Sequence, residues 1–359
     1  MGVLIAGGGT GGHLYPGVAV AQELRRRAPE TRILFVGTAR GIEVKAVPRA
    51  GFELALLPVS GLRGKGLLAF VLGLLRLPLA LWQAFKVVRR FRPSVAVSVG
   101  GYAAGPAVVV AHLMRVPCVV LEQNAVAGIT NRLLGRIARR VVAALPTRGF
   151  APHKVLVLGN PVRADFIQVR DVPYAVGNPL RLFVFGGSQG ARALNDVMLE
   201  VAVHLAQRAP FIEVEHQTGS ADEARMRAFY AARRLQNVTV KPFVFDMARA
   251  MAEAHLVLCR AGASTIAELA VCGRPAILVP FPFAVDDHQT ANAEALVAAG
   301  GAVLLPQADL RGSTLADLII GLAADRDRLC TMAAAARGLG RPQAVEAIAD
   351  VVTQEAAHV

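Results

Sequence analysis

Short apolar runs alternate with longer amphipathic segments along the whole chain. Turn residues follow each short run, which is typical of buried strands in a parallel sheet, and the longer segments between them predict helices. In the first half the predicted strands lie at residues 32–36, 95–99, 116–121 and 155–158. In the second half they lie at residues 182–185, 212–216, 238–240, 256–258, 276–279 and 302–304. The alternation predicts an α/β fold with parallel sheets.

A strand, a glycine-rich turn and a helix follow one another at two places in the chain. The first is residues 3–24 (VLIAGGGTGGHLYPGVAVAQEL) and the second is residues 182–198 (LFVFGGSQGARALNDVM). Such a turn exposes backbone N–H groups at a helix N-terminus, where the helix dipole favours an anion. We therefore expect two nucleotide-style domains, each with a site that handles phosphate.

The domain boundary is predicted near residue 164, since turn formers at residues 159–163 (GNPVR) close the first half. This gives an N-terminal domain over residues 1–163 and a C-terminal domain over residues 164–340. Residues 316–357 predict two alanine-rich helices divided at residues 338–342. The last segment, residues 341–359, is expected to pack back on the N-terminal domain.

The composition indicates a cellular compartment and shows that charge is unevenly distributed along the chain. The four cysteines form no C-x-x-C pair, and the first residues (MGVLIAGGG) lack the basic start of a signal peptide, so a reducing compartment is expected. Residues 1–163 carry 22 Lys and Arg against 5 Asp and Glu, whereas residues 164–359 carry 17 against 21. A cationic first half suits an anionic surface, either nucleic acid or a phospholipid leaflet, although an arginine-rich composition alone would also raise the charge.

Residues 66–85 (GLLAFVLGLLRLPLALWQAF) form an unusually apolar stretch with basic residues on both flanks. Three interpretations remain open: a patch lying on a membrane surface, ordinary core helices, or a membrane span. Arg76 near the middle of the stretch and Pro78 after it count against a span.

The first glycine turn matches G-x-G-x-x-G at Gly7, Gly9 and Gly12. A dinucleotide-binding domain usually offers an acidic residue at the end of its second strand, but Gly37 and Thr38 stand there, which argues against NAD. His13 follows the turn directly and is a candidate general base, with a purely structural histidine as the alternative.

Polar and glycine residues follow two further strands of the first half. Gly100, Gly101 and Tyr102 come after the strand at residues 95–99, and Glu122, Gln123 and Asn124 come after the next. Because the carboxyl ends of parallel strands meet at one edge of a sheet, these groups are expected to lie near the first glycine turn.

The second half offers two similar segments. In Arg260–Glu268 (RAGASTIAE), Ser264 or Thr265 is expected to cap a helix that faces a diphosphate, and Glu268 to accept a ribose hydroxyl. The alternative is a simple capping pair of Ser264 with Glu268. Residues 286–289 (DDHQ) with Asn292 suit sugar hydroxyls and are weak as a metal site.

With these residues in view, the chain resembles the MurG family of N-acetylglucosaminyltransferases of peptidoglycan synthesis. The resemblance covers nearly the whole chain and is carried by seven motifs in the family's order: GGGTGGHLYPGVAVA, SVGGYAAGPAV, EQNAVAG, GNPVR, FGGSQGARALN, RAGASTIAEL and DDHQTANA. It implies a GT-B fold, with two Rossmann-like domains whose parallel sheets face a central cleft.

The resemblance also implies the substrates: UDP-N-acetylglucosamine as donor and undecaprenyl-pyrophosphoryl-MurNAc-pentapeptide as acceptor, with inversion at the sugar, no cofactor and no metal. From their positions after the strands, Gly100, Gly101, Tyr102 and Glu122 are the expected acceptor contacts, and His13 is the best-placed general base. The implied donor contacts are Thr10, Gly11, Gly12, Asn124, Arg163, Ser188, Val244, Ala263, Ser264, Thr265, Ile266, Ala267, Glu268 and Gln289. Val244 stands where the family often has isoleucine.

A membrane-borne acceptor would explain the positive charge of the first half of the chain. We expect residues 66–85 and their basic flanks to dock on anionic lipid through Leu74, Leu75 and Trp82. The expected location is then the cytoplasmic face of the cell membrane, as a peripheral protein that does not bind nucleic acid.

Two rival functions are weaker on the residues. A UDP-N-acetylglucosamine 2-epimerase shares the fold class but needs carboxylates for proton abstraction, and the first half offers few acids beyond Glu122. A nucleic-acid-binding module would explain the charge alone, yet aromatic residues make up only 6% of the chain and no recognised motif accompanies the arginines.

Overall fold

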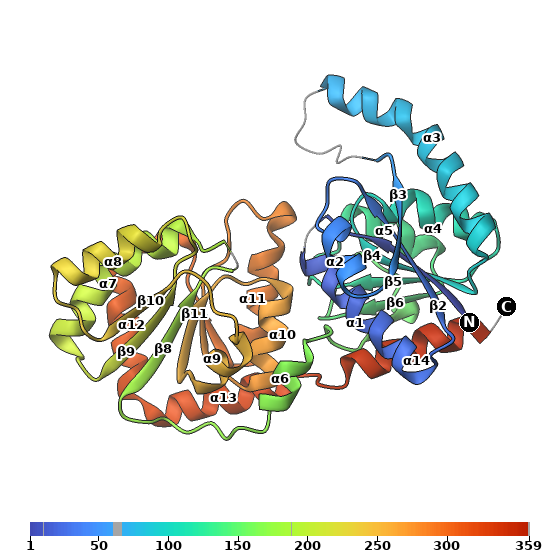
Figure 1. Cartoon of the computed structure of the whole chain (residues 1–359). Coiled ribbons are helices and arrows are strands. Elements are labelled where there is room, and N and C mark those ends of the chain that lie inside the picture. The colour runs from blue at the N-terminus through green and yellow to red at the C-terminus, as the bar shows by residue number, and fades with distance from the viewer. Residues whose placement is uncertain (10, 60–66, 188, 358–359) are drawn as a thin grey trace. The chain divides into compact units, whose positions relative to one another are not determined.

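The computed structural model describes residues 1–9, 11–59, 67–187 and 189–357, without the side chains of residues 67–76. The chain divides into two compact units. An N-terminal unit combines Met1–Val162 with Gln343–Val359, and a C-terminal unit comprises Arg163–Pro342. Each unit is built around a parallel sheet with helices on both faces (Figure 1).

The sheet of the N-terminal unit has seven strands in the order β3-β2-β1-β4-β5-β6-β7. Its strands are β1 (Gly2–Gly7), β2 (Arg32–Thr38), β3 (Glu53–Leu57), β4 (Val95–Gly100), β5 (Cys118–Glu122), β6 (Arg140–Ala143) and β7 (Val155–Val157). Its helices are α1 (Gly11–Arg27), α2 (Glu43–Arg49), α3 (Leu67–Phe91), α4 (Ala104–Leu113), α5 (Ile129–Ile137), the short η1 (Pro152–Lys154) and α14 (Ala344–Ala357). All residues of β1 and β4 at the centre are buried, as expected for strands covered on both faces.

The sheet of the C-terminal unit has six strands in the order β10-β9-β8-β11-β12-β13. Its strands are β8 (Leu180–Phe185), β9 (Ile212–Gln217), β10 (Val238–Lys241), β11 (Leu256–Cys259), β12 (Ala276–Leu278) and β13 (Ala302–Leu304). Its helices are α6 (Ala164–Val169), α7 (Arg192–Arg208), α8 (Glu223–Ala232), α9 (Met247–Glu253), α10 (Ala263–Cys272), α11 (His288–Ala298), α12 (Gly312–Ala324) and α13 (Arg326–Leu339), with short η2 (Val285–Asp287) and η3 (Gln307–Asp309).

Each strand predicted from an apolar run is present within two residues of its expected start. Two strands of the N-terminal sheet, β3 and β6, did not stand out in the sequence. β3 has one buried residue among five, and β6 is four residues long and opens with the exposed Arg140. Both segments carry short apolar runs, at residues 54–57 and 141–145, but the first lies in a largely unburied strand and the second in a strand of only four residues.

The predicted pair of helices over residues 316–357 is wrong, because three helices occupy the C-terminal region. The first predicted helix is divided at Asp325 into α12 and α13. The Asp325 carboxylate accepts a hydrogen bond from the backbone N–H of Arg328 at 2.9 Å and so caps α13. The alanine-rich composition hid this local start signal.

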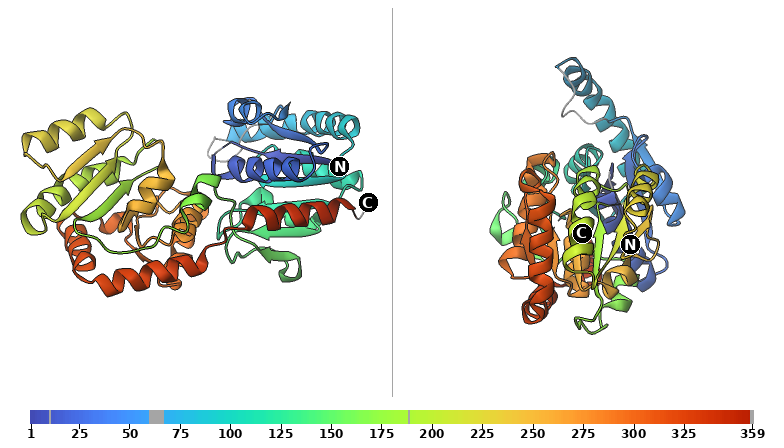
Figure 2. Two further views of the ribbon diagram at one scale, coloured as in Figure 1. Left: turned by 60° about the horizontal axis from the view of Figure 1, so that its bottom comes forward. Right: turned by 90° about the vertical axis from the view of Figure 1, so that its left-hand side faces the viewer.

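The last helix, α14, belongs to the N-terminal unit. Figures 1 and 2 both show it lying along that unit, and Ile348 and Val352 join a core with Val20 and Leu24 of α1. The buried Glu355 of α14 pairs with two half-exposed arginines at the start of β6, Arg139 at 3.5 Å and Arg140 at 3.4 Å. The chain therefore returns to complete the core in which it began.

Helix α3 is amphipathic in the part whose side chains are described. Ala80, Ala84 and Val88 are buried in the core against α4, while Trp82 between them is 53% exposed. Among the residues that the structure describes, no helix combines the length and the apolar character needed to cross a bilayer.

Candidate functional sites

In the N-terminal unit, the first glycine turn lies against the turn that follows β4. The backbone N–H of Gly8 donates to the carbonyl of Gly100 at 3.2 Å. Gly8, Gly100 and Gly101 all have φ between +86° and +146°, where a side chain is strained, and a Cβ on Gly101 would collide with the carbonyl of Gly8. The sequence predicted that these two turns would meet at one sheet edge, and they do.

A buried carboxylate that the sequence analysis missed holds the first glycine turn. Glu43 is fully buried, and its two oxygens accept hydrogen bonds from the backbone N–H of Gly9 and from the N–H and hydroxyl of Thr38, each at 2.9 Å. Burial alone would raise the pKa of this carboxyl, but the hydrogen bonds outweigh burial and the pKa is lowered. The N–H of Gly9 is thus committed to the protein itself.

The signal for Glu43 was present in the sequence but was sought at the wrong position. An acidic residue was expected directly at the end of the second strand, where Gly37 and Thr38 stand. The acid comes five residues after Thr38 and folds back over the strand end, with room because Gly37 and Gly41 carry no side chain against it.

His13 lies beside the β4 turn, on the first turn of α1. Its Nδ1 is 3.0 Å from Oε1 of Gln123, which follows β5, and the imidazole is close to Gly100, whose Cβ would lie 3.4 Å from Nδ1. His13 is half-buried. The structure thus brings His13 together with Gly100, as the strand-end argument predicted.

Glu122 is buried and organises the loop after β5. Its carboxylate accepts hydrogen bonds from the backbone N–H of Asn124 at 3.0 Å and of Gly128 at 3.2 Å, and from Nδ2 of Asn131 at 3.0 Å. Asn131 in turn accepts from the hydroxyl of Ser98 at 2.7 Å. Both carboxylate oxygens are engaged within the fold, so Glu122 shapes the loop that carries Asn124 instead of projecting from it.

In the C-terminal unit, the second glycine turn is tied to the end of β9. Nε2 of the buried Gln217 donates to the carbonyl of Gly187 at 3.1 Å, and the N–H of Gly190 donates to the same carbonyl at 2.8 Å. A Cβ on Gly190 would overlap the carbonyl of Thr218. The turn therefore packs backbone against backbone, like its counterpart in the N-terminal unit.

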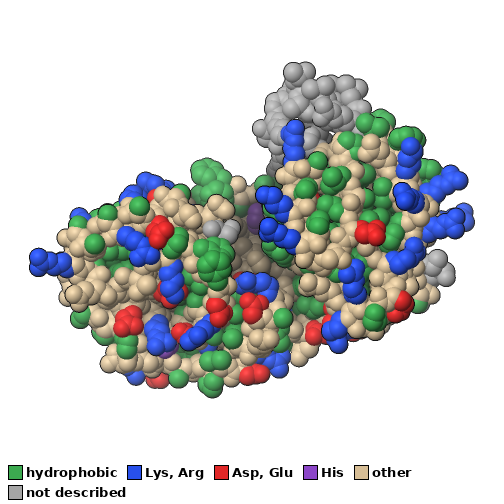
Figure 3. Space-filling view, in the orientation of Figure 1, with side chains coloured by type: hydrophobic (Ala, Val, Ile, Leu, Met, Phe, Trp, Pro, Cys, Tyr) green, Lys and Arg blue, Asp and Glu red, His purple; other side chains and the backbone are tan. Residues whose placement is uncertain are grey.

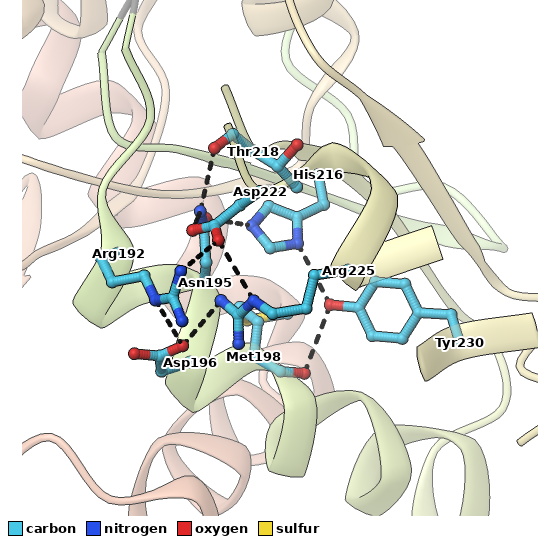
Figure 4. Close-up of polar contacts among 9 residues, drawn as sticks. All are labelled: Arg192, Asn195, Asp196, Met198, His216, Thr218, Asp222, Arg225 and Tyr230. Atoms are coloured by element: carbon cyan, nitrogen blue, oxygen red, sulfur yellow. Dashed lines mark hydrogen bonds and ion pairs between the residues drawn. The ribbon is translucent and has the colours of Figure 1, made fainter. Parts of the chain in front are cut away.

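A buried polar network anchors the helix that leaves this turn (Figure 4). Nδ2 of Asn195, on α7, donates to the carbonyl of Thr218 at 2.9 Å and to the carboxylate of Asp222 at 2.8 Å. Its Oδ1 is 3.1 Å from Nε2 of His216, whose Nδ1 is 3.1 Å from the hydroxyl of Tyr230. The network fixes α7 to the end of β9.

His216 is fully buried in this network. Burial lowers its pKa to about 4, against the opposing attraction of Asp222. The imidazole is therefore neutral at pH 7. Asp222 itself accepts from Arg192 at 2.6 Å and Arg225 at 3.1 Å.

The expected cap of α10 is wrong: neither Ser264 nor Thr265 caps the helix, and the N-cap is Gly262 with an extended backbone. No side chain accepts a hydrogen bond at this cap. A glycine cap leaves the first N–H groups of α10 without a competing side-chain oxygen, so this helix end keeps its capacity for an anion.

Glu268 and Arg163 form a pair behind this helix end. Nε of Arg163 is 3.6 Å from Oε1 of Glu268. The main contact of the Glu268 carboxylate is therefore Arg163, and not Ser264 as in the alternative interpretation. Burial raises the pKa of Glu268 to about 7, and Arg163 opposes the rise. The Arg163 guanidinium, in contrast, is half exposed.

Gln289 and Asn292 line the same side of the C-terminal unit through α11. Oε1 of Gln289 accepts from the backbone N–H of Phe281 at 2.9 Å, which commits the oxygen of this amide to the protein. Nδ2 of the buried Asn292 donates to the carbonyl of Ala261 at 3.3 Å, directly before the cap of α10. Val244 is buried in the loop after β10.

The structure thus gathers the predicted residues into two groups, one in each unit. Gly11, Gly12, His13, Gly100, Gly101, Tyr102, Glu122 and Asn124 belong to the N-terminal unit, and Arg163, Val244, Ala263, Ser264, Thr265, Ile266, Ala267, Glu268 and Gln289 belong to the C-terminal unit. Thr10 and Ser188 lie outside the described residues, as do the side chains of Leu74 and Leu75.

Two family descriptions match the chain. The glycosyltransferase family 28 N-terminal domain matches residues 3–143, and the glycosyltransferase family 28 C-terminal domain matches residues 181–350. Together they cover most of both units.

Named relatives match this chain over nearly its full length. The chain is 49% identical to a protein of Anaeromyxobacter dehalogenans (strain 2CP-C), over 98% of this chain and 92% of that one. It is 47% identical to a protein of Syntrophus aciditrophicus (strain SB), over 97% of both chains. Both relatives are named UDP-N-acetylglucosamine–N-acetylmuramyl-(pentapeptide) pyrophosphoryl-undecaprenol N-acetylglucosamine transferase.

Solved structures agree with these relatives. The crystal structure of Acinetobacter baumannii MurG is similar with a TM-score of 0.82 and 32% identity, over 98% of this chain and 99% of that one. A UDP-GlcNAc 2-epimerase from Neisseria meningitidis is similar with a TM-score of 0.69 and 15% identity, over 99% of this chain and 100% of that one. The second likeness shows the shared fold alone.

Replacing Glu43 with Gln is expected to destabilise the N-terminal unit. An amide in place of the carboxylate turns an NH₂ group toward buried N–H donors, which costs about 1–3 kcal/mol in the free energy of unfolding. Denaturant unfolding measures the loss, with Glu53→Gln on the exposed side of β3 as the matched control. Equal stability of the two variants would contradict the role given to Glu43.

His216 is expected to destabilise the C-terminal unit progressively as the pH drops from about 6.5 to about 4, whereas the raised pKa of Glu268 acts in the opposite direction over part of this range. In that range the unfolded chain protonates His216 while the folded protein does not, so protons favour unfolding by up to about 3 kcal/mol. Urea unfolding across this range measures the slope. The stability of the wild type relative to His216→Gln should fall by this amount as the pH drops, because Glu268 contributes equally to both proteins, whereas the stability relative to His112→Gln, at an exposed position, should stay constant.

Proposed function

The chain belongs to the MurG family within glycosyltransferase family 28, and from this premise we propose how its residues carry out the family's reaction. The protein is an N-acetylglucosaminyltransferase with a GT-B fold that transfers N-acetylglucosamine from UDP-N-acetylglucosamine to the MurNAc-pentapeptide of a pyrophosphoryl-undecaprenol acceptor. The observation that carries this function is 49% identity to a named transferase over 98% of the chain. The roles of individual residues below are our proposal.

The donor diphosphate is assigned to the N-terminus of α10. The glycine cap leaves backbone N–H groups of Ala263, Ser264 and Thr265 facing outward, and the half-exposed Arg163 adds a full positive charge beside them. When the bond between the sugar and UDP breaks, negative charge grows on the departing diphosphate. Fixed N–H dipoles and Arg163 stabilise that charge without rearrangement, so the scheme uses no metal ion and no cofactor.

Glu268, Gln289 and Val244 are assigned to the rest of the donor. Glu268 accepts hydroxyl groups of the ribose, and its contact with Arg163 couples ribose binding to diphosphate binding. The Nε2 group of Gln289 donates to hydroxyls of the sugar, because Phe281 already fixes its oxygen. The backbone at Val244 contacts uracil, with Ile266 and Ala267 completing the α10 segment and Ser188 on the second glycine turn. Thr10, Gly11, Gly12 and Asn124 are the donor contacts assigned to the N-terminal unit.

His13 is assigned as the general base. The acceptor hydroxyl attacks the anomeric carbon from the face opposite UDP, which inverts the sugar, and its proton passes to the imidazole as the new bond forms. The position of His13 beside Gly100 supports this role, since it places the base at the sheet edge where two glycine turns meet. Gly100, Gly101 and Tyr102 are assigned to the acceptor.

Glu122 is assigned to acceptor binding through the loop that it holds. Its oxygens are already engaged by Asn124, Gly128 and Asn131, so we propose that it shapes the surface under the acceptor.

We propose that the N-terminal unit docks on anionic lipid, which brings the enzyme to its membrane-borne acceptor. Leu79, Trp82 and Phe85 of α3 are between 40% and 53% exposed, and Lys86 lies over the Trp82 ring at 3.4 Å. Leu113, at the end of α4 packed beside α3, is 74% exposed. On the face in Figure 3, this unit shows many basic and few acidic side chains. The proposed location is the cytoplasmic face of the membrane.

One assay tests the catalytic proposal: release of UDP from UDP-N-acetylglucosamine, with and without a short-chain lipid-linked MurNAc-pentapeptide. Wild type should release UDP only when acceptor is present. His13→Ala should lower kcat/KM by about 10²- to 10⁴-fold, the usual contribution of a general base. His112→Ala, an exposed histidine on α4, is the matched control. Undiminished activity of His13→Ala would remove the base from the scheme.

Co-sedimentation with vesicles containing anionic lipid tests the docking proposal. Changing Leu79 and Trp82 together to Ser should weaken binding by tenfold or more, since burying one large apolar side chain contributes about 1.5–3 kcal/mol. Phe245→Ser, at an 88% exposed aromatic residue of the C-terminal unit, is the matched control. Unchanged binding of the double variant would reject the α3 surface.

A further inference from the structure

We propose that Gln123 is a positioning residue that sets the tautomer of His13 and thereby keeps Nε2 of the imidazole ready to accept a proton. The inference rests on the proposed role of His13 as general base and adds the group that makes the role possible. A neutral imidazole carries one proton, and only the other ring nitrogen can act as a base. Which nitrogen is free is therefore part of the mechanism.

The orientation of the Gln123 amide follows from its second contact. Nε2 of Gln123 is 3.4 Å from the carbonyl oxygen of Leu121, which accepts hydrogen bonds and cannot donate them. The NH₂ group must therefore face Leu121, and the amide oxygen faces His13. Gln123 is 2% exposed, so solvent does not compete for either end of this amide.

The amide oxygen then determines the tautomer of the ring. Oε1 of Gln123 lies 3.0 Å from Nδ1 of His13, and an amide oxygen can only accept. Nδ1 must carry the proton, which leaves the lone pair on Nε2. Among the residues that the structure describes, no hydrogen-bond partner meets Nε2. The described residues thus leave the lone pair on Nε2 uncommitted.

The surroundings also hold the ring in this orientation. Gly100 lies under the imidazole, where a Cβ would come within 3.4 Å of Nδ1 and 3.7 Å of Cε1. The Leu121 carbonyl that orients Gln123 also accepts from Nδ2 of Asn131 at 2.9 Å, so it is held from two sides. A ring flip would exchange Nδ1 for a carbon and lose the bond to Gln123. Gly100 and Gln123 thus hold the imidazole directly, and Leu121 and Asn131 hold Gln123 in place.

The other explanation of these contacts is that Gln123 only fills space and satisfies a buried histidine nitrogen. The two explanations differ in what the loss of the amide oxygen does. A space-filling residue can be replaced by an apolar one of similar shape with an effect on stability alone. A positioning residue acts through His13, so its replacement changes the tautomer and the rate, and has no further effect once His13 is gone.

The first experiment reads the tautomer directly, without turnover. In the full-length protein with ¹⁵N-labelled histidine, the ring-nitrogen chemical shifts of His13, assigned with His13→Ala, should report a neutral ring with the proton on Nδ1. Gln123→Met keeps the length of the side chain but lacks the amide oxygen, and should move the signal toward the other tautomer. Gln354→Met, at an exposed position on α14, should leave it unchanged. A proton on Nε2 in the wild type would overturn the inference.

The second experiment is a double-mutant cycle on kcat/KM. Gln123→Met is expected to lower kcat/KM by about tenfold or more through kcat, with the KM for UDP-N-acetylglucosamine unchanged, because the base is present in the wrong tautomer. In the His13→Ala background the same change should have no effect. A Gln123→Met effect of equal size in both backgrounds would show a structural role and overturn the inference.

The two proposals fail in distinguishable ways. If His13→Ala keeps full activity, the general-base role fails, while the NMR result still reports whether Gln123 sets the tautomer. A second outcome is that His13→Ala is inactive, while Gln123→Met is fully active and unfolds cooperatively on heating. In that case His13 is still the general base, and Gln123 is not its positioning residue.

Discussion

The close approach of two backbone turns in the N-terminal unit is the constraint on which its site depends. Gly8 and Gly100 are joined by a backbone hydrogen bond of 3.2 Å, and a side chain on Gly101 would collide with Gly8. Only glycine allows the positive φ values and the contact together. The two turns follow β1 and β4, which are neighbours at the centre of the sheet. Their contact therefore fixes the backbone against which the His13 side chain packs.

Buried polar side chains hold the glycine turns in both units, with opposite chemistry. In the N-terminal unit the Glu43 carboxylate accepts from the N–H of Gly9, whereas in the C-terminal unit the Gln217 amide donates to the carbonyl of Gly187. A glycine-rich turn has few side-chain contacts of its own, so a partner from a neighbouring segment must define its shape. Each partner is nearly fully buried, which makes its hydrogen bonds costly to lose.

The two units contribute different chemical groups to the one proposed reaction. The C-terminal unit offers positive charge and helix N–H groups, through Arg163 and the glycine-capped α10, for the charge that develops on a departing diphosphate. The N-terminal unit offers an imidazole whose protonation is set by Gln123 and an apolar, basic surface on α3. A soluble donor and a lipid-linked acceptor require these two different environments. In this proposal the C-terminal unit stabilises the leaving group, and the N-terminal unit accepts the proton.

The sequence by itself determined the parallel α/β architecture, the two glycine turns and the segments that follow each buried strand. These features are local, because an apolar run, the glycines that follow it and the start of the next helix lie within one short stretch of sequence. Membership of the family was also readable, since seven motifs occur in a fixed order. The division of one alanine-rich helix at Asp325 was local too, but composition concealed it.

Only the tertiary structure decided which groups hold the turns and the base. Glu43 and Gly9 are 34 residues apart, and His13 and Gln123 are 110 apart, so no periodicity links them. Capping of α10 by Gly262 instead of Ser264, and engagement of Glu122 within its own loop, likewise depend on where neighbouring chain segments come to lie. A hydrogen bond depends on distance and direction in space, and the order of residues fixes these only once the sheets have formed.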